Sequence, residues 1–115
     1  MPIVRIEIVG DARARLAQAL ADRLGDLFQV APGRVWVSIH RIAVADYAEN
    51  QTPSPVQPVF VSVLVRRYPE SGLADLAYAI AEVVGALCER PVDHVHVLFE
   101  PPAAGRIAFG GRLLE

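Results

Sequence analysis

The sequence predicts an α+β fold, in which a four-stranded sheet carries two helices on one of its faces. Two observations predict it. Segments in which apolar and polar residues alternate are each followed by a longer segment whose apolar residues recur at helical spacing. This β-α-β order occurs twice, at about residues 2–42 and 59–99, with a polar loop at residues 43–58 between the two copies. The 115 residues are therefore expected to form a single domain.

The first copy begins with an alternating strand at residues 3–9, whose even-numbered residues are apolar. From residue 12 to residue 28 leucines recur at helical spacing, which predicts an amphipathic helix. An Ala-Pro-Gly turn at residues 31–33 leads to a second alternating strand at residues 34–42. The connection between the two strands is long enough for a parallel crossover.

The second copy repeats this plan. Its first strand, residues 59–65, is almost entirely apolar, as expected for a central strand that is buried on both faces. Apolar residues at helical spacing follow between residues 73 and 87, and Pro91 ends that helix. A fourth strand is expected at residues 94–99. The last segment, residues 105–114, contains paired glycines and predicts a small hairpin or a docking tail.

The amino-acid composition limits the classes of function that are expected for the chain. Hydrophobic residues make up 53% of the chain and charged residues 21%, so we expect some apolar surface to be buried in an oligomer. The sequence has no stripe of basic residues that would indicate a nucleic-acid partner. It also has no apolar run that approaches the ~20 residues needed to span a bilayer. Cys88 is the single cysteine and lies among apolar helical residues, where it is expected to pack in the core. With no secretory signal pattern at the start, a reducing, cytoplasmic location is expected.

Both ends of the sequence carry a recognisable pattern. Met1 and Pro2 directly precede the first strand, and the strand at residues 95–99 is followed by Gly105–Gly111 with its paired glycines. Together with the doubled β-α-β plan, these features resemble the tautomerase superfamily, which includes 4-oxalocrotonate tautomerase and macrophage migration inhibitory factor. The resemblance covers essentially the whole chain. It implies a homotrimer with active sites near the subunit boundaries and no cofactor.

Pro2 is the candidate catalytic base. Removal of Met1 would expose a secondary amine, and burial in an apolar surround lowers the pKa of a terminal amine, ordinarily near ~8, toward neutrality. A neutral amine can take a proton from the carbon next to a carbonyl group and return it elsewhere. The sequence and the resemblance together predict keto-enol tautomerisation of a small 2-oxo or 2-hydroxy-dienoic acid.

Positive charge is needed to hold the substrate carboxylate and the enolate. Arg66 and Arg67 end the strand that is expected beside the first one. Superfamily decarboxylases and dehalogenases place a carboxylate-binding arginine at the position that matches Arg66, and an arginine fork suits a carboxylate. The alternative is that both arginines are solvated charges at a strand end.

Other residues complete the candidate site. The resemblance places the wall of the pocket near Ile107 and Phe109, while His96 is a candidate donor and Tyr47 reaches from the polar loop. Trp36 is expected either to line the site or, by preference, to pack in the trimer. No spacing of Cys, His or carboxylate residues supports a metal site.

Departures from the family pattern keep other functions open. Arginines that 4-oxalocrotonate tautomerase uses are replaced at Ala12, Trp36 and His96, so the substrate need not be 4-oxalocrotonate. Gly33 and Ala108 stand where water-activating enzymes carry an acid, which counts against hydrolytic chemistry. A dehalogenase or decarboxylase on the same scaffold remains an alternative. So does a ferredoxin-like binding module, in which Pro2 only starts a strand.

Overall fold

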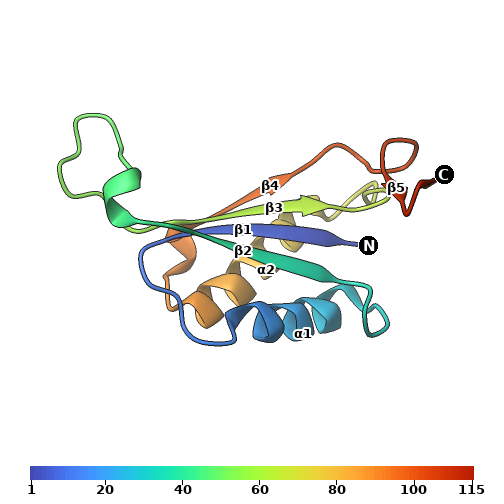
Figure 1. The fold of residues 1–115 in the computed structure, drawn as a ribbon, viewed down its shortest axis with the longest axis horizontal. Helices are drawn as coiled ribbons and strands as arrows, with labels where there is room; N and C mark the ends of the chain where they lie inside the picture. The colour runs from blue at the N-terminus through green and yellow to red at the C-terminus, as the bar shows by residue number, and fades with distance from the viewer.

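The computed structural model describes residues 1–115, which form two strand-helix-strand units followed by a small hairpin (Figure 1). The elements, in chain order, are β1 (Ile3–Val9), α1 (Leu16–Phe28), β2 (Trp36–Ile42), η1 (Val44–Asp46), β3 (Val59–Leu64), α2 (Leu73–Cys88), η2 (Val92–His94), β4 (Val95–Phe99), β5 (Ala108–Phe109) and β6 (Arg112–Leu113). The two η elements are single turns of 3-10 helix. Neither α-helix is both long and apolar enough to cross a membrane.

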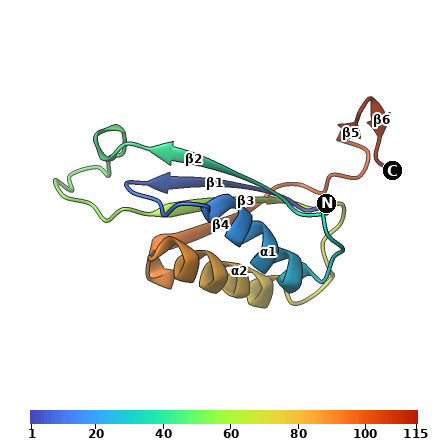
Figure 2. The ribbon, with the colours of Figure 1, turned by 60° about the horizontal axis from the view of Figure 1, so that its bottom comes forward.

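The four long strands form one sheet in the order β2-β1-β3-β4. Within each unit the two strands are parallel neighbours, and the two units meet through the antiparallel pair β1 and β3. Both helices cover the same face of this sheet (Figure 2). The predicted α+β class, the parallel crossovers and the helices on one face are thus confirmed.

The ferredoxin-like alternative is wrong. That arrangement splits each β-α-β unit, because another strand is inserted between its two strands. Here β1 lies directly beside β2, and β3 lies directly beside β4. Each helical connection therefore joins two neighbouring strands, and the sheet has a different strand order from a ferredoxin-like module.

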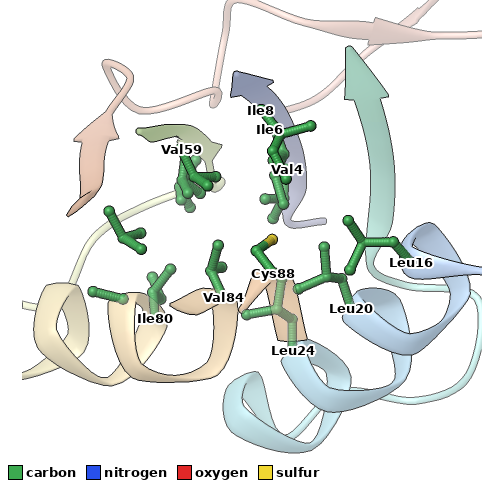
Figure 3. Packing of buried hydrophobic residues seen from close by; sticks show 14 residues of the cluster. Val4, Ile6, Ile8, Leu16, Leu20, Leu24, Val59, Ile80, Val84 and Cys88 are labelled. Carbon is green, nitrogen blue, oxygen red and sulfur yellow. The ribbon is translucent and has the colours of Figure 1, made fainter. Parts of the chain in front are cut away.

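The hydrophobic core fills the space between the sheet and the two helices (Figure 3). Alternate strand residues supply one side of it, and apolar helix residues supply the other. Its 14 buried residues are Val4, Ile6, Ile8, Leu16, Leu20, Leu24, Val59, Val61, Val63, Ile80, Ala81, Val84, Cys88 and Val95. Burial raises the pKa of the Cys88 thiol, in keeping with its expected role in packing.

The expectation that residues 59–65 are buried on both faces is wrong for the single chain. Val59 and Val63 are fully buried on the helix side, but Phe60 and Ser62 on the other face are only half-buried. The apolar residues of β3 on that side have no covering layer within the chain. This open sheet face comprises Ile3, Arg5, Glu7, Trp36, Ser38, His40, Phe60, Ser62, Leu64, His96 and Leu98.

Several element boundaries differ from the sequence prediction. Helix α1 begins four residues after the expected residue 12, because Arg15 has a left-handed backbone (φ 58°) that cannot continue a helix. Strand β2 begins at Trp36 rather than residue 34, since the N–H of Arg34 donates to the carbonyl of Ala31 in a turn. The turn η1 inside the polar loop was not predicted.

Arg90 joins three parts of the chain just after α2. Its guanidinium donates to the carbonyl oxygens of Gln57 (2.9 Å), Cys88 (2.8 Å), Val9 (2.9 Å) and Asp11 (3.2 Å). The end of β1, the residue before Pro58 and the end of α2 are thereby held together. These carbonyl groups lie outside the strand and helix ladders, so Arg90 satisfies acceptors that would otherwise depend on water.

Two helical glycines provide a matched test of this packing. A Cβ atom at Gly85 would lie 2.8 Å from the backbone oxygen of Arg90, whereas a Cβ atom at Gly25 would meet nothing within 4 Å. We expect Gly25→Ala to stabilise the protein by about 0.5–1 kcal/mol, the ordinary helix preference for alanine. Gly85→Ala should instead destabilise it, because the α2–Arg90 contact must open. Urea unfolding of both variants checks this, and equal shifts in the same direction would contradict the tight contact.

Candidate active site

Pro2 lies at the start of β1, between the neighbouring strands. It is buried, and its carbonyl oxygen accepts a hydrogen bond from the N–H of Trp36 (3.1 Å). On the other side the next residue, Ile3, pairs with Leu64, which is the last residue of β3. The first residues of β1 therefore lie between the start of β2 and the end of β3.

Arg66 and Arg67 follow β3 at this same end of the sheet. Both side chains are exposed, and the carbonyl oxygen of Arg66 accepts from the N–H of Ala104 (3.2 Å). The hydroxyl of Tyr68 contacts the carbonyls of Val63 (3.0 Å) and Glu100, which ties the end of β3 to the segment after β4. The strand before them is the neighbour of β1, as expected, but it ends at Leu64, so Arg66 and Arg67 lie just beyond the strand rather than at its end.

The C-terminal segment also returns to this end. The N–H of buried Ala103 donates to the carbonyl of Val65 (2.9 Å), and the N–H of Ile107 donates to Ala103 (3.2 Å). The ring of Phe109 meets the edge of Trp36 at a centroid distance of 5.4 Å. Figure 2 shows the β5–β6 hairpin beyond the end of the sheet at which the chain begins. Ile107 and Phe109 thus lie at the same end as Pro2.

The electrostatics at the chain start favour a neutral amine. Burial, and then the positive charge of Arg34, lower the pKa of the Met1 amine from its ordinary value of 8.0. Arg34 was not among the residues predicted from sequence. Its only signal was its place just before the second strand, and its nearness to the chain start depends on how β2 pairs with β1.

The structure places Tyr47 and His96 at the opposite end of the sheet. His96 pairs with Phe60, which pairs with Glu7, five residues and about 16 Å along β1 from Pro2. The ring of Tyr47 lies 6.1 Å from that of Phe60, and Phe60 lies 5.5 Å from His96. Since β3 runs antiparallel to β1 and parallel to β4, the start of β4 lies at the same end of the sheet as the end of β1. Within one chain these two residues therefore do not join Pro2.

Tyr47 has a partner of its own in the loop. Its hydroxyl donates to Glu49 (2.7 Å), and this hydrogen bond, with a smaller effect of burial, raises the pKa of Tyr47. The phenol therefore stays protonated and acts as a donor near neutral pH.

Two cavities of the single chain lie away from Pro2. One, of about 620 Å³, lies between α1 and the turn before β2 and is lined by Asp22, Asp26 and Pro32 among others. The other, of about 330 Å³, lies under the polar loop and is lined by Tyr47 and Val56 among others. No three His, Cys, Asp or Glu residues are grouped so that they could hold a metal ion.

Comparison with known proteins places the fold. Neither a family model nor a curated protein sequence matches the chain. Among solved structures, a fused 4-OT described as a wild-type symmetric trimer superimposes with a TM-score of 0.78 at 16% identity, covering 96% of this chain and 94% of that one. Pt0534 inactivated by 2-oxo-3-pentynoate gives a TM-score of 0.78 at 17% identity, covering 96% and 95%.

A third structure is N1, a member of the cis-3-chloroacrylic acid dehalogenase family. It superimposes with a TM-score of 0.71 at 23% identity, covering 98% of this chain and 83% of that one. These similarities extend over nearly the whole chain, and they confirm at the level of fold the resemblance that the sequence showed. The protein has the fold of the tautomerase superfamily.

Proposed function

We propose that the protein is a tautomerase that moves a proton between carbon and oxygen in a small 2-oxo or 2-hydroxy-dienoic acid. One observation carries this proposal: Pro2 is buried at the start of β1, next to the end of β3, and burial and Arg34 lower the pKa of the adjacent Met1 amine. Removal of Met1 transfers the chain-terminal amine to Pro2, one residue further into the same surround. A neutral secondary amine there is a suitable general base.

In the proposed reaction the lone pair of the Pro2 nitrogen takes a proton from one position of the conjugated acid and returns it to another. Arg66 binds the carboxylate and stabilises negative charge as the enolate forms, with Arg67 as a second cation at the same strand end. Ile107 and Phe109 supply the apolar side of the pocket. The proton is only relocated, so the reaction needs no cofactor.

We further propose that three copies of the chain assemble into a homotrimer through the open sheet face. Trp36 is 52% exposed and Leu98 61% exposed on that face, which is a large apolar exposure for a single chain. The fused 4-OT of the same fold is described as a symmetric trimer. Tyr47 and His96 can take part in a Pro2 site only where a neighbouring chain completes it, and the trimer provides such neighbours.

A dehalogenase is the second candidate, supported by the likeness to N1. That chemistry requires a carboxylate that activates water near the base. In this chain Glu100 is the half-buried acid after β4, on the far side of β3 from Pro2. Release of chloride from cis-3-chloroacrylate by the purified protein would favour this second candidate over the tautomerase. A decarboxylation product in a parallel assay would instead indicate a decarboxylase on the same scaffold.

The test combines the intact mass of the protein with its rate of turnover of an enol acid. Intact mass should show loss of Met1, and 2-oxo-3-pentynoate should add once, because the Pro2 nitrogen bonds to the alkyne carbon remote from the carbonyl while its proton passes to the neighbouring carbon. The unlabelled protein should ketonise phenylenolpyruvate or 2-hydroxymuconate. A version with a short N-terminal extension, which blocks the amine, is the control. Equal turnover by the extended protein would overturn the proposal.

A further inference from the structure

The open sheet face carries one arginine and one carboxylate near its middle. Arg5 and Glu7 are alternate residues of β1, one of the two central strands, and both side chains are exposed. They lie on the same side of the sheet and about 7 Å apart along the strand. In Figure 2 no further layer of the chain covers the sheet on the side away from the helices.

The neighbouring strands place no carboxylate beside Arg5 and no lysine or arginine beside Glu7. Their partners in the sheet are Ser38 and Ser62 for Arg5, and His40 and Phe60 for Glu7. The Nε2 atom of His40 lies 3.2 Å from the hydroxyl oxygen of Ser38, and His96 on β4 is the remaining titratable residue of the face. On its own face, Arg5 therefore has no carboxylate near it other than that of Glu7.

Exposed apolar side chains flank these two charges. Trp36 on β2 is 52% exposed and Leu98 on β4 is 61% exposed, and β1 lies between the two strands that carry them. A protein that covers both apolar residues must therefore also cover Arg5 and Glu7. Burial of an ionised side chain without a counter-charge is strongly unfavourable. Whatever covers this face must supply a carboxylate for Arg5 and a cation for Glu7.

We propose that a second copy of this chain supplies both counter-charges, so that Arg5 of one subunit pairs with Glu7 of the next. This inference rests on the proposed homotrimer. Each copy brings one cation and one carboxylate at the same place, so the open sheet face is complementary to itself. A strongly acidic or strongly basic partner would instead repel one of the two charges. In a closed ring all interfaces are alike, so every Arg5 and every Glu7 has a counter-charge.

The experiment reverses the two charges singly, as Arg5→Glu and Glu7→Arg, and together in a double variant. Both side chains are exposed, so each variant should fold, which circular dichroism and urea unfolding check. Arg23→Glu, on the exposed side of α1, is the matched control, because it reverses the same charge away from the open sheet face. Native mass spectrometry and sedimentation measure the protein concentration at which half of the trimer has dissociated.

A mixture of the two single variants separates pairing between copies from pairing within one chain. Arg5→Glu leaves the face with two carboxylates, and Glu7→Arg leaves it with two guanidinium groups, so neither variant can pair these charges with itself. In the mixture, opposite charges can meet only across a subunit boundary. We expect mixed trimers, identified by their masses, at a protein concentration where each variant alone is dissociated.

For each single reversal we expect the half-dissociation concentration to rise at least about tenfold, because like charges then face each other. The double reversal should return it to within about threefold of wild type, and Arg23→Glu should leave it unchanged. Unchanged dissociation in both single reversals, or a mixture without mixed trimers, would overturn the inference. A wild-type chain that stays monomeric would overturn it together with the proposed homotrimer. A trimer that responds as expected but ketonises no enol acid would contradict the proposed reaction alone.

Discussion

Substitution of Pro2 by alanine is expected to lower kcat/KM for ketonisation of an enol acid by about 10²-fold or more, the usual contribution of a positioned general base. Alanine is small enough for Met1 still to be removed, so an amine remains. It is, however, a primary amine on a freely rotating terminus, and the ring that fixes the direction of the lone pair is lost. Steady-state kinetics of both proteins, with intact masses, measure the effect.

The pH dependence provides the second half of this prediction. The base works in its neutral form, so kcat/KM should rise with pH as the Pro2 amine loses its proton and then level off. Burial and Arg34 lower the pKa of the Met1 amine from its ordinary value of 8.0. We expect the same surround to lower the pKa of the Pro2 amine, so activity should persist to lower pH than an exposed prolyl amine would allow. Pro32→Ala, in the exposed turn before β2, is the matched control. Wild-type rates in Pro2→Ala would show that Pro2 only starts the strand.

Substitution of Arg90 by methionine is expected to lower the free energy of unfolding by about 3 kcal/mol, because hydrogen bonds from a charged donor are worth more than neutral ones and several are lost together. The four carbonyl acceptors belong to the ends of β1 and α2 and to the segment before β3. Methionine keeps much of the apolar stem, so the loss reports the guanidinium.

Urea unfolding at one fixed protein concentration is the appropriate measurement, since assembly would otherwise alter the apparent stability. Arg23→Met, on the exposed side of α1, is the control and should change stability by no more than about 0.5 kcal/mol. If Arg90→Met and Arg23→Met unfold at the same urea concentration, then the bonds of Arg90 contribute nothing beyond what water provides.

The faces of the strands were predictable from sequence, because a slip of one residue would turn Ile6 and Ile8 toward the wrong side. The start of helix α1 was not predictable, since arginine at position 15 is not a residue type that indicates a left-handed backbone. Strand direction was also hidden. Nothing local in the sequence shows that β1 and β3 run antiparallel, and that single fact separates Tyr47 and His96 from Pro2.

Arg34 is a further residue whose position could not be predicted from local sequence. The residue was visible in the sequence, but its nearness to the chain start depends on the contact of Trp36 with Pro2, which joins residues more than thirty positions apart. Arg66 could be named as a candidate because the strand before it was expected next to the first one. Residues within one element could thus be assigned from periodicity, whereas the assembly of the site depended on pairings between elements.

The antiparallel pairing of β1 with β3 bears on the history of the chain. The two β-α-β units begin at opposite ends of the sheet: β1 begins at the end where Pro2 lies, and β3 begins at the other end, directly after the 43–58 loop. In the proposed tautomerase, therefore, only the end at which β1 begins uses a terminal amine. The second end, which Tyr47, Phe60 and His96 now occupy, is released from the constraint of preserving a terminal proline.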